Sequence, residues 1–116
     1  MKAVIQRVSQ AACMVDQEMT GEIGRGYMIL VGFCNDDNEK TVQKMVEKIV
    51  RLRIFEDENG KMNRSILEVN GAVLSISQFT LYANAKKGNR PSFIEAAKPD
   101  ISRPLYEMFN EKLAHY

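Results

Sequence analysis

A short apolar run between two glycines constrains this fold more than any other part of the chain. Residues 27–31 read Tyr-Met-Ile-Leu-Val, and they lie between Gly26 and Gly32. Because the run has no polar residue at every second position, it predicts a central strand that is covered on both faces. The rest of the fold must supply that cover.

Other short segments rich in β-formers surround this central strand. We predict strands at residues 2–8, 11–15, 18–23 and 72–79. Asp16 and Gln17 form a plausible hairpin turn between the second and third of these segments. Most of the predicted sheet therefore comes from the first third of the chain.

Two amphipathic helices are expected. Apolar residues recur at spacings of three and four between Val42 and Val50, which predicts a helix of about four turns capped by the side chains of residues 35–38. A second helix is predicted to begin at Ser102 as its N-cap, with Pro104 in its first turn. Its apolar stripe runs through residues 105–113.

The order of these elements predicts an α+β fold. Strands come first and helices are interspersed without a βαβ rhythm, which favours a mainly antiparallel sheet with a barrel-like core and two amphipathic helices. The 116 residues suffice for a single domain, 1–116, and a hydrophobic share of 45% with a charged share of 27% excludes disorder. A net charge of +1 does not indicate a globally basic nucleic-acid binder.

Several kinds of chemistry are improbable for this composition. His115 is the only histidine and lies in the last two residues, so a serine or cysteine triad is not expected. Cys13 and Cys34 are far apart and belong to no metal-binding spacing, so no metal site is expected. We expect two buried thiols in a reducing cytoplasm, and the longest apolar run is too short to span a membrane.

One segment carries polar side chains where a strand should leave the core. Residues 77–83 read Ser-Gln-Phe-Thr-Leu-Tyr-Ala. A strand end offers backbone N–H groups that can hold a developing oxyanion, and Gln78 and Thr80 add further hydrogen-bonding groups. The alternative is an edge strand that becomes polar as it meets water. Phe79 and Tyr82 suit a core and a pocket equally, whereas Phe93 is expected to pack in the core.

A basic loop follows this segment. Lys86, Lys87 and Arg90 surround Gly88 within residues 84–91. These cations could lie against phosphates, or the loop could simply be solvated. Beside a strand end that holds a neutral reacting group, they indicate a site for a polyanionic substrate.

The same two segments resemble a known family. Residues 77–83, followed by Lys-Gly-Asn-Arg-Pro-Ser-Phe at 87–93, closely resemble the signature of D-aminoacyl-tRNA deacylases. Other stretches agree with this family along the whole chain, in order: residues 4–9, 21–24, 52–57 and 60–63.

The resemblance implies a homodimeric enzyme that hydrolyses the ester between a D-amino acid and the terminal adenosine of tRNA. It also implies clearance of glycine wrongly attached to tRNA, and neither a metal nor an organic cofactor. Its pocket is built around Ser77, Gln78, Phe79 and Thr80. Since no histidine or other evident base could take the proton of Thr80, we expect this residue to orient the ester rather than attack it.

The sequence departs from the family pattern near its C-terminus. Family members read substrate chirality with a Gly-Pro pair inserted into the partner's pocket, and no Gly-Pro pair occurs here. Arg7 resembles the residue that supports this pair. The chain is therefore expected either to be an incomplete copy that lacks the family's last strands or to be a degenerate member.

Two other functions remain open at this point. A catalytically inactive tRNA-binding or dimerisation module of the same fold would bind RNA without hydrolysing either D- or L-aminoacyl-tRNA. A general esterase without an RNA partner would hydrolyse its substrate with little dependence on salt.

Overall fold

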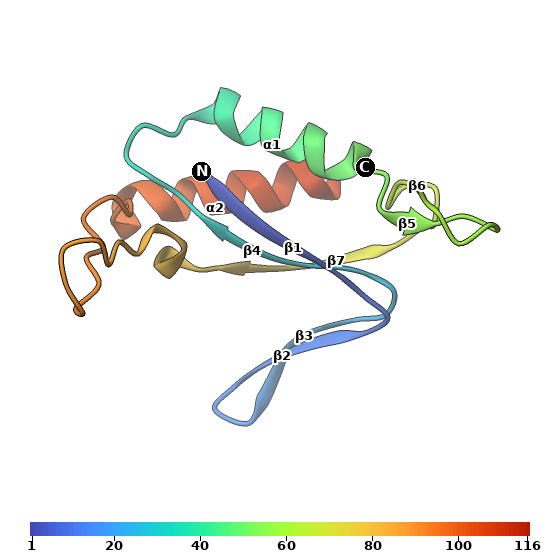
Figure 1. Cartoon of the computed structure of the whole chain (residues 1–116), viewed down its shortest axis with the longest axis horizontal. Helices are drawn as coiled ribbons and strands as arrows, with labels where there is room; N and C mark the ends of the chain where they lie inside the picture. The colour runs from blue at the N-terminus through green and yellow to red at the C-terminus, as the bar shows by residue number, and fades with distance from the viewer.

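The chain folds as an α+β structure in which two helices cover one face of a small sheet (Figure 1). The computed structural model describes residues 1–116. The sheet has the strand order β1 (Lys2–Val8), β4 (Gly26–Gly32) and β7 (Ala72–Ser77). Helices α1 (Glu39–Arg51) and α2 (Pro99–Ala114) pack together above it.

Three of the four strand pairings are antiparallel, as predicted, but the three-stranded sheet itself is mixed. Strand β1 pairs antiparallel with β4, as predicted, but β7 pairs with β4 in parallel. The chain leaves β4 through α1 before it returns as β7, and a crossover of this kind brings a strand back in the same direction. The three strands form an open sheet, so the expected barrel-like core is not formed by them.

Two hairpins extend from this sheet. Strands β2 (Ala11–Val15) and β3 (Glu18–Ile23) form an antiparallel pair that projects away from the helices (Figure 1). Asp16 and Gln17 both have positive φ, at 50° and 68°, which confirms the predicted turn. The second hairpin joins β5 (Phe55–Glu56) to β6 (Met62–Arg64).

The core lies between the sheet and the helices. Tyr27, Ile29 and Val31 of β4 are fully buried against this layer, whereas Met28 and Leu30 on the opposite face are only half-buried. The prediction of a strand covered on both faces was therefore only partly right, because the helices cover a single face.

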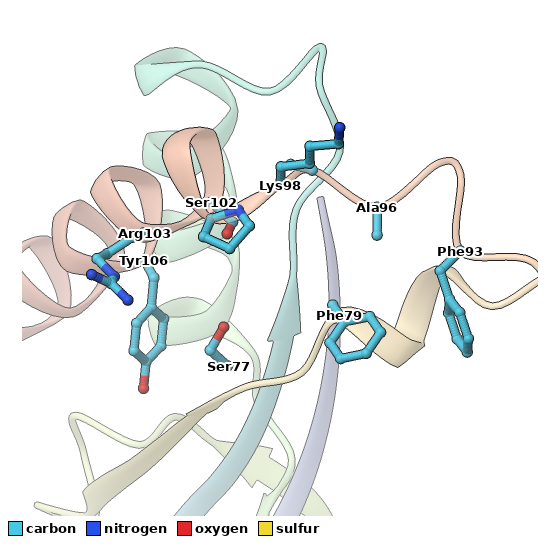
Figure 2. A pocket seen from close by; sticks show the side chains of 10 residues that line it. Ser77, Phe79, Phe93, Ala96, Lys98, Ser102, Arg103 and Tyr106 are labelled. Atoms are coloured by element: carbon cyan, nitrogen blue, oxygen red, sulfur yellow. The ribbon is translucent and has the colours of Figure 1, made fainter.

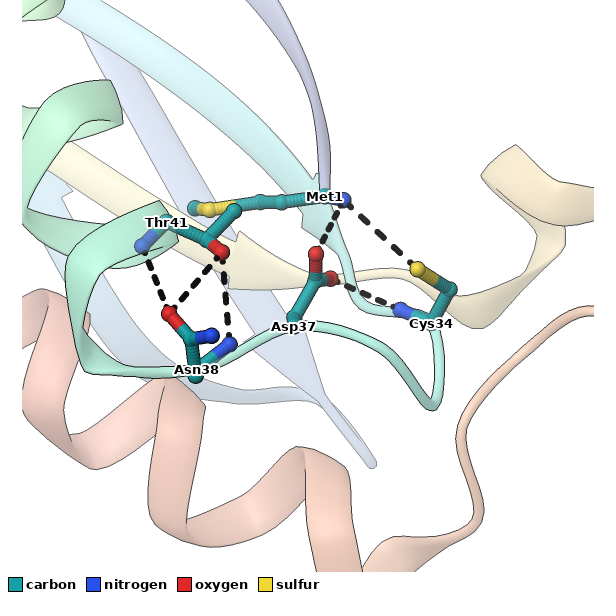
Figure 3. Close-up of polar contacts among 5 residues, drawn as sticks. All are labelled: Met1, Cys34, Asp37, Asn38 and Thr41. Atoms are coloured by element: carbon teal, nitrogen blue, oxygen red, sulfur yellow. Dashed lines mark hydrogen bonds and ion pairs between the residues drawn. The ribbon is translucent and has the colours of Figure 1, made fainter.

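The predicted start of α1 agrees with the structure, and the predicted start of α2 does not. Asn38 caps α1, and its side chain accepts a hydrogen bond from the Thr41 N–H at 3.2 Å (Figure 3). Ser102 does not cap α2, whose N-cap is Lys98, four residues earlier. Pro99 occupies the first helical position, where its missing N–H costs nothing. Pro104 consequently lies inside the helix and not in its first turn.

The helices are also short relative to a lipid bilayer. Neither of them combines the length and the apolar character that a membrane-spanning helix requires.

Candidate functional site

The candidate site begins where β7 ends. The Gln78 N–H makes the last bond to the sheet, donating to the Val31 carbonyl at 2.7 Å. The chain then turns into a short 3₁₀ helix, η1 (Phe79–Tyr82), so the strand ends two residues earlier than predicted. A 3₁₀ helix bonds each N–H to the carbonyl three residues before it, so the N–H groups of Phe79 and Thr80 have no partner within η1.

A side-chain contact joins two residues of this strand end. The Gln78 carboxamide donates a hydrogen bond to the Thr80 hydroxyl. Thr80 is exposed, and Gln78 is half-buried. The strand end therefore presents two unpaired backbone N–H groups beside an amide and a hydroxyl.

A cavity of about 590 Å³ lies beside this strand end (Figure 2). Phe79 and Phe93 stand on one side of it as an edge-to-face pair, with ring centroids 5.2 Å apart. Arg103 and Tyr106 of α2 stand on the other side. The full lining is Ser77, Phe79, Phe93, Ala96, Ala97, Lys98, Pro99, Ser102, Arg103 and Tyr106.

Tyr106, which lines this cavity, forms a hydrogen bond between α2 and the sheet. Its hydroxyl donates to the Ser75 carbonyl at 2.8 Å and lies 3.4 Å from the Ser75 hydroxyl. Since β7 is an edge strand of the sheet, this contact satisfies a carbonyl that has no neighbouring strand. The start of α2 is thereby held at a fixed place relative to Ser77.

Strand β4 supports η1 from behind. A Cβ atom on Gly32 would lie 2.9 Å from the Gln78 carbonyl oxygen, so only glycine permits this approach. Tyr82 is buried, and this burial, followed by a hydrogen bond with Cys34, raises the pKa of its phenol well above the usual range. Lys2 adds a hydrogen bond to the Leu81 carbonyl at 3.3 Å.

A buried ion pair lies next to this support (Figure 3). The Met1 ammonium donates to one Asp37 carboxylate oxygen at 2.8 Å, and the Cys34 N–H donates to the other at 2.8 Å. Cys34 also lies next to the Tyr82 hydroxyl. The contacts of Met1, Asp37, Cys34 and Tyr82 therefore connect the loop before α1 to η1.

The structure brings some of the predicted site residues together. Ser77 and Phe79 line the cavity, and Gln78 and Thr80 adjoin them in the chain. Phe93 also lines the cavity and is 38% exposed, so the expectation that it packs in the core was wrong. Its place follows from the hydrogen bonds that close the preceding loop.

The basic loop stands apart from the cavity lining. Lys86, Lys87 and Arg90 are all exposed, and none of them lines the cavity. Two hydrogen bonds between Asn84 and Ser92, both 2.8 Å, close the loop at its base. The loop is thus a compact projection between η1 and Phe93.

Arg7 is not brought to this cavity. The strand register pairs Lys2 with Gly32 at the η1 end, and it pairs Arg7 with Tyr27 near the other end of β4. Arg7 donates to the Ile54 carbonyl at 2.6 Å and lines a separate cavity of about 360 Å³ with Arg25.

Sequence reasoning missed two cations of the cavity, Lys98 and Arg103. Both belong to the start of α2, which was predicted too late in the chain, and no spacing marked them as functional. Together with the aromatic pair they make the cavity suited to a ligand that combines a flat ring with negative charge.

The chemistry of the strand end follows from its hydrogen-bonding groups. Backbone N–H groups and the Thr80 hydroxyl can polarise a carbonyl, whereas the Gln78 carboxamide has no basic atom that could deprotonate the hydroxyl. No group of three His, Cys, Asp or Glu side chains is arranged to hold a metal ion.

Comparisons with known proteins agree on one family. The family model described as D-Tyr-tRNA(Tyr) deacylase matches residues 4–116. The chain is similar to a D-aminoacyl-tRNA deacylase of Limosilactobacillus reuteri (strain DSM 20016), with 57% identity over 114 residues that cover 98% of this chain and 79% of the relative. A D-aminoacyl-tRNA deacylase of Bacillus pumilus (strain SAFR-032) is 55% identical over 113 residues, covering 97% and 77%.

Two solved structures share this fold. The chain resembles the c-Myc DNA Unwinding Element Binding Protein with a TM-score of 0.93 and 40% identity, covering 99% of this chain and 77% of that one. A probable eukaryotic D-amino acid tRNA deacylase shares the fold with a TM-score of 0.81 at 20% identity, covering 96% and 65%. Since a family model spans nearly all of the sequence and the relatives above are more than half identical to it, the chain belongs to the D-Tyr-tRNA(Tyr) deacylase family.

Proposed function

We propose that this protein is a D-aminoacyl-tRNA deacylase that hydrolyses the ester bond at the end of β7. The two relatives above carry this activity in their names, and their identity to the chain supports the same reaction here. The observation that carries the proposal in this structure is the pair of free N–H groups on Phe79 and Thr80, beside the cavity.

The ester carbonyl is held by these two N–H groups. Negative charge builds on the carbonyl oxygen as water adds, and donors that are already in place stabilise it without reorganisation. The water oxygen bonds to the carbonyl carbon, and the bond from that carbon to the ribose oxygen then breaks. The ribose oxygen takes up a proton as it leaves, so a free D-amino acid and free tRNA result.

Thr80 orients the carbonyl in this mechanism and does not attack it. Its hydroxyl already accepts a hydrogen bond from Gln78, which leaves its own proton to donate toward the substrate. An aminoacyl ester is an activated acyl group, and the neighbouring ribose hydroxyl can help to position the water. Binding and positioning then provide most of the rate enhancement.

The cavity takes the terminal adenosine. Phe79 and Phe93 provide aromatic faces on which a base can stack. Lys98 and Arg103 are positioned to meet the phosphate that precedes it, and Lys86, Lys87 and Arg90 meet phosphates further along the RNA. The substrate is thus recognised by its unpaired 3′ end.

The active form of the enzyme is a homodimer. It acts in the cytoplasm as a proofreading enzyme, and it also hydrolyses glycyl-tRNA. The face of the sheet opposite the helices supports a dimer, because Val4 is 50% exposed there and Leu30 and Ile76 are half-buried. A second copy packed on this face would remove that apolar surface from water.

Incubation of the purified chain with D-tyrosyl-tRNA and L-tyrosyl-tRNA tests the function. We expect release of D-tyrosine well above the spontaneous rate. No hydrolysis of either substrate, together with retained RNA binding, would identify an inactive tRNA-binding module. Hydrolysis that is insensitive to salt would instead indicate a general esterase.

A further inference from the structure

A row of lysines on α1 forms a second basic surface, which the cavity does not include. Lys40, Lys44 and Lys48 are four residues apart, so they lie along one face of the helix. All three are exposed, and they line a hollow of about 560 Å³ with Asn38, Thr41 and Met45. We call these three residues the lysine row.

No carboxylate neutralises the lysine row. None of the three lysines takes part in an ion pair. The two carboxylates of α1 are engaged elsewhere, since Glu39 pairs with Lys112 of α2 at 3.5 Å and Glu47 accepts a hydrogen bond from Gln43 at 2.9 Å. In a chain with a net charge of only +1, this face is a local concentration of positive charge.

The length of the row suits a nucleic-acid backbone. A helix rises 1.5 Å per residue, so Lys40 and Lys48 are about 12 Å apart along the axis. At about 3.4 Å of duplex axis per phosphate on one strand, that length spans about three to four phosphates. Three unpaired ammonium groups spread over this length can therefore each contact a phosphate of one strand.

The row starts at the end of the molecule that holds the candidate site. Asn38 follows Asp37, whose carboxylate binds Cys34, the neighbour of Tyr82 in η1. From there α1 leads away from η1 and its loop (Figure 1). When the 3′ end of the substrate lies in the cavity, the lysine row is thus available to the base-paired part of the RNA.

We infer that the lysine row binds the sugar-phosphate backbone of the tRNA acceptor stem, separately from the cavity that takes the 3′ end. This inference rests on the proposed function for its choice of partner. It adds a second contact surface that recognises the duplex by charge and shape and not by sequence.

Binding of uncharged RNA tests this inference independently of hydrolysis. The dissociation constants of a whole tRNA and of a short unpaired oligonucleotide with the same 3′ end are measured for the full chain at several salt concentrations. The variants are the triple Lys40→Gln/Lys44→Gln/Lys48→Gln, the single Lys44→Gln and the single Lys61→Gln. Lys61 lies on the β5–β6 turn, outside the lysine row, and provides a one-charge control.

We expect the triple variant to lower the preference for tRNA over the oligonucleotide roughly tenfold and to reduce the salt-dependence slope for tRNA by about two to three. Lys44→Gln should have a larger effect than Lys61→Gln. Unchanged tRNA affinity in the triple variant would overturn the inference, and so would an equal loss for both RNAs. Loss of binding to anionic lipid vesicles with tRNA affinity unchanged would assign the row to a membrane surface. Failure of the proposed hydrolysis appears separately, in the tyrosyl-tRNA assay.

Discussion

Gln78 and Thr80 are linked by a side-chain hydrogen bond at the point where β7 passes into η1. The Gln78 amide is the donor, so the lone pair of the Thr80 hydroxyl is engaged and its proton remains available to a ligand. This arrangement suits a residue that orients a carbonyl. A nucleophilic threonine would instead need a basic atom at the same distance.

Replacing Thr80 with alanine should therefore slow the deacylase reaction without abolishing it. The loss expected is about tenfold or less, which corresponds to one orienting hydrogen bond, because the backbone N–H groups of Phe79 and Thr80 are retained. Single-turnover hydrolysis of D-tyrosyl-tRNA measures the effect. An acyl group trapped on Thr80 and detected by mass spectrometry would contradict this role.

Gly32 tests the support of η1. In Gly32→Ala the new Cβ would meet the Gln78 carbonyl oxygen at 2.9 Å, so the start of η1 must shift. We expect a loss of about 1–3 kcal/mol in the free energy of unfolding, as for other overpacked sites, together with a lower kcat. Gly24→Ala is the matched control, because nothing lies within 4 Å of its Cβ. Equal activity of both variants would show that catalysis does not depend on the position of η1.

The basic loop should contribute to RNA affinity and little to chemistry. Neutralising Lys86, Lys87 and Arg90 together should weaken binding by a similar factor for every tRNA and reduce the salt-dependence slope by up to about three. Filter binding over a range of salt concentrations measures both effects. Selective loss for one tRNA would indicate base recognition instead.

The ion pair between Met1 and Asp37 should be a large contributor to stability near η1. The side chains of Met1 and Asp37 are 0% and 5% exposed, so Asp37→Asn leaves the Met1 ammonium without its counter-charge in a largely buried place. We expect the free energy of unfolding to fall by about 3 kcal/mol in urea titrations. Asp36→Asn, one residue away and exposed, should change it by less than about 0.5 kcal/mol.

Stability should also decrease in alkaline solution. Burial raises the pKa of Tyr82 above its ordinary value near 10, so the unfolded chain loses this proton first as the pH rises. The contribution is fully present below about pH 10 and is lost above it. Urea unfolding between pH 9 and 11 should show the decline, and Tyr82→Phe should flatten it. Tyr116→Phe, at an exposed position, should leave the decline as it is.

Local sequence patterns predicted the elements that depend on neighbouring residues. The turn at Asp16 and the helix capped by Asn38 formed as expected, because turn geometry and capping are decided within a few residues. The start of α2 was placed wrongly at Ser102, because Pro99 competes as a first helical residue and no local rule ranks the two signals.

Contacts between residues far apart in the sequence could not be predicted, for a physical reason. The parallel pairing of β7 with β4 depends on the path of the chain after α1. The hydrophobic periodicity of the two strands contains no information about that path. The same is true of Lys98 and Arg103, which reach the cavity because α2 packs on the core through Leu105 and Phe109. The polar segment after β7 was recognised because its residues are contiguous in the sequence, although the strand ends two residues earlier than predicted.

The most direct test of this account is a crystal structure with a non-hydrolysable amide analogue of 3′-D-aminoacyl-adenosine. We predict that its carbonyl oxygen lies within hydrogen-bonding distance of the N–H groups of Phe79 and Thr80, with the adenine against Phe93. An analogue bound away from this strand end, for example in the cavity of Arg7 and Arg25, would contradict the account.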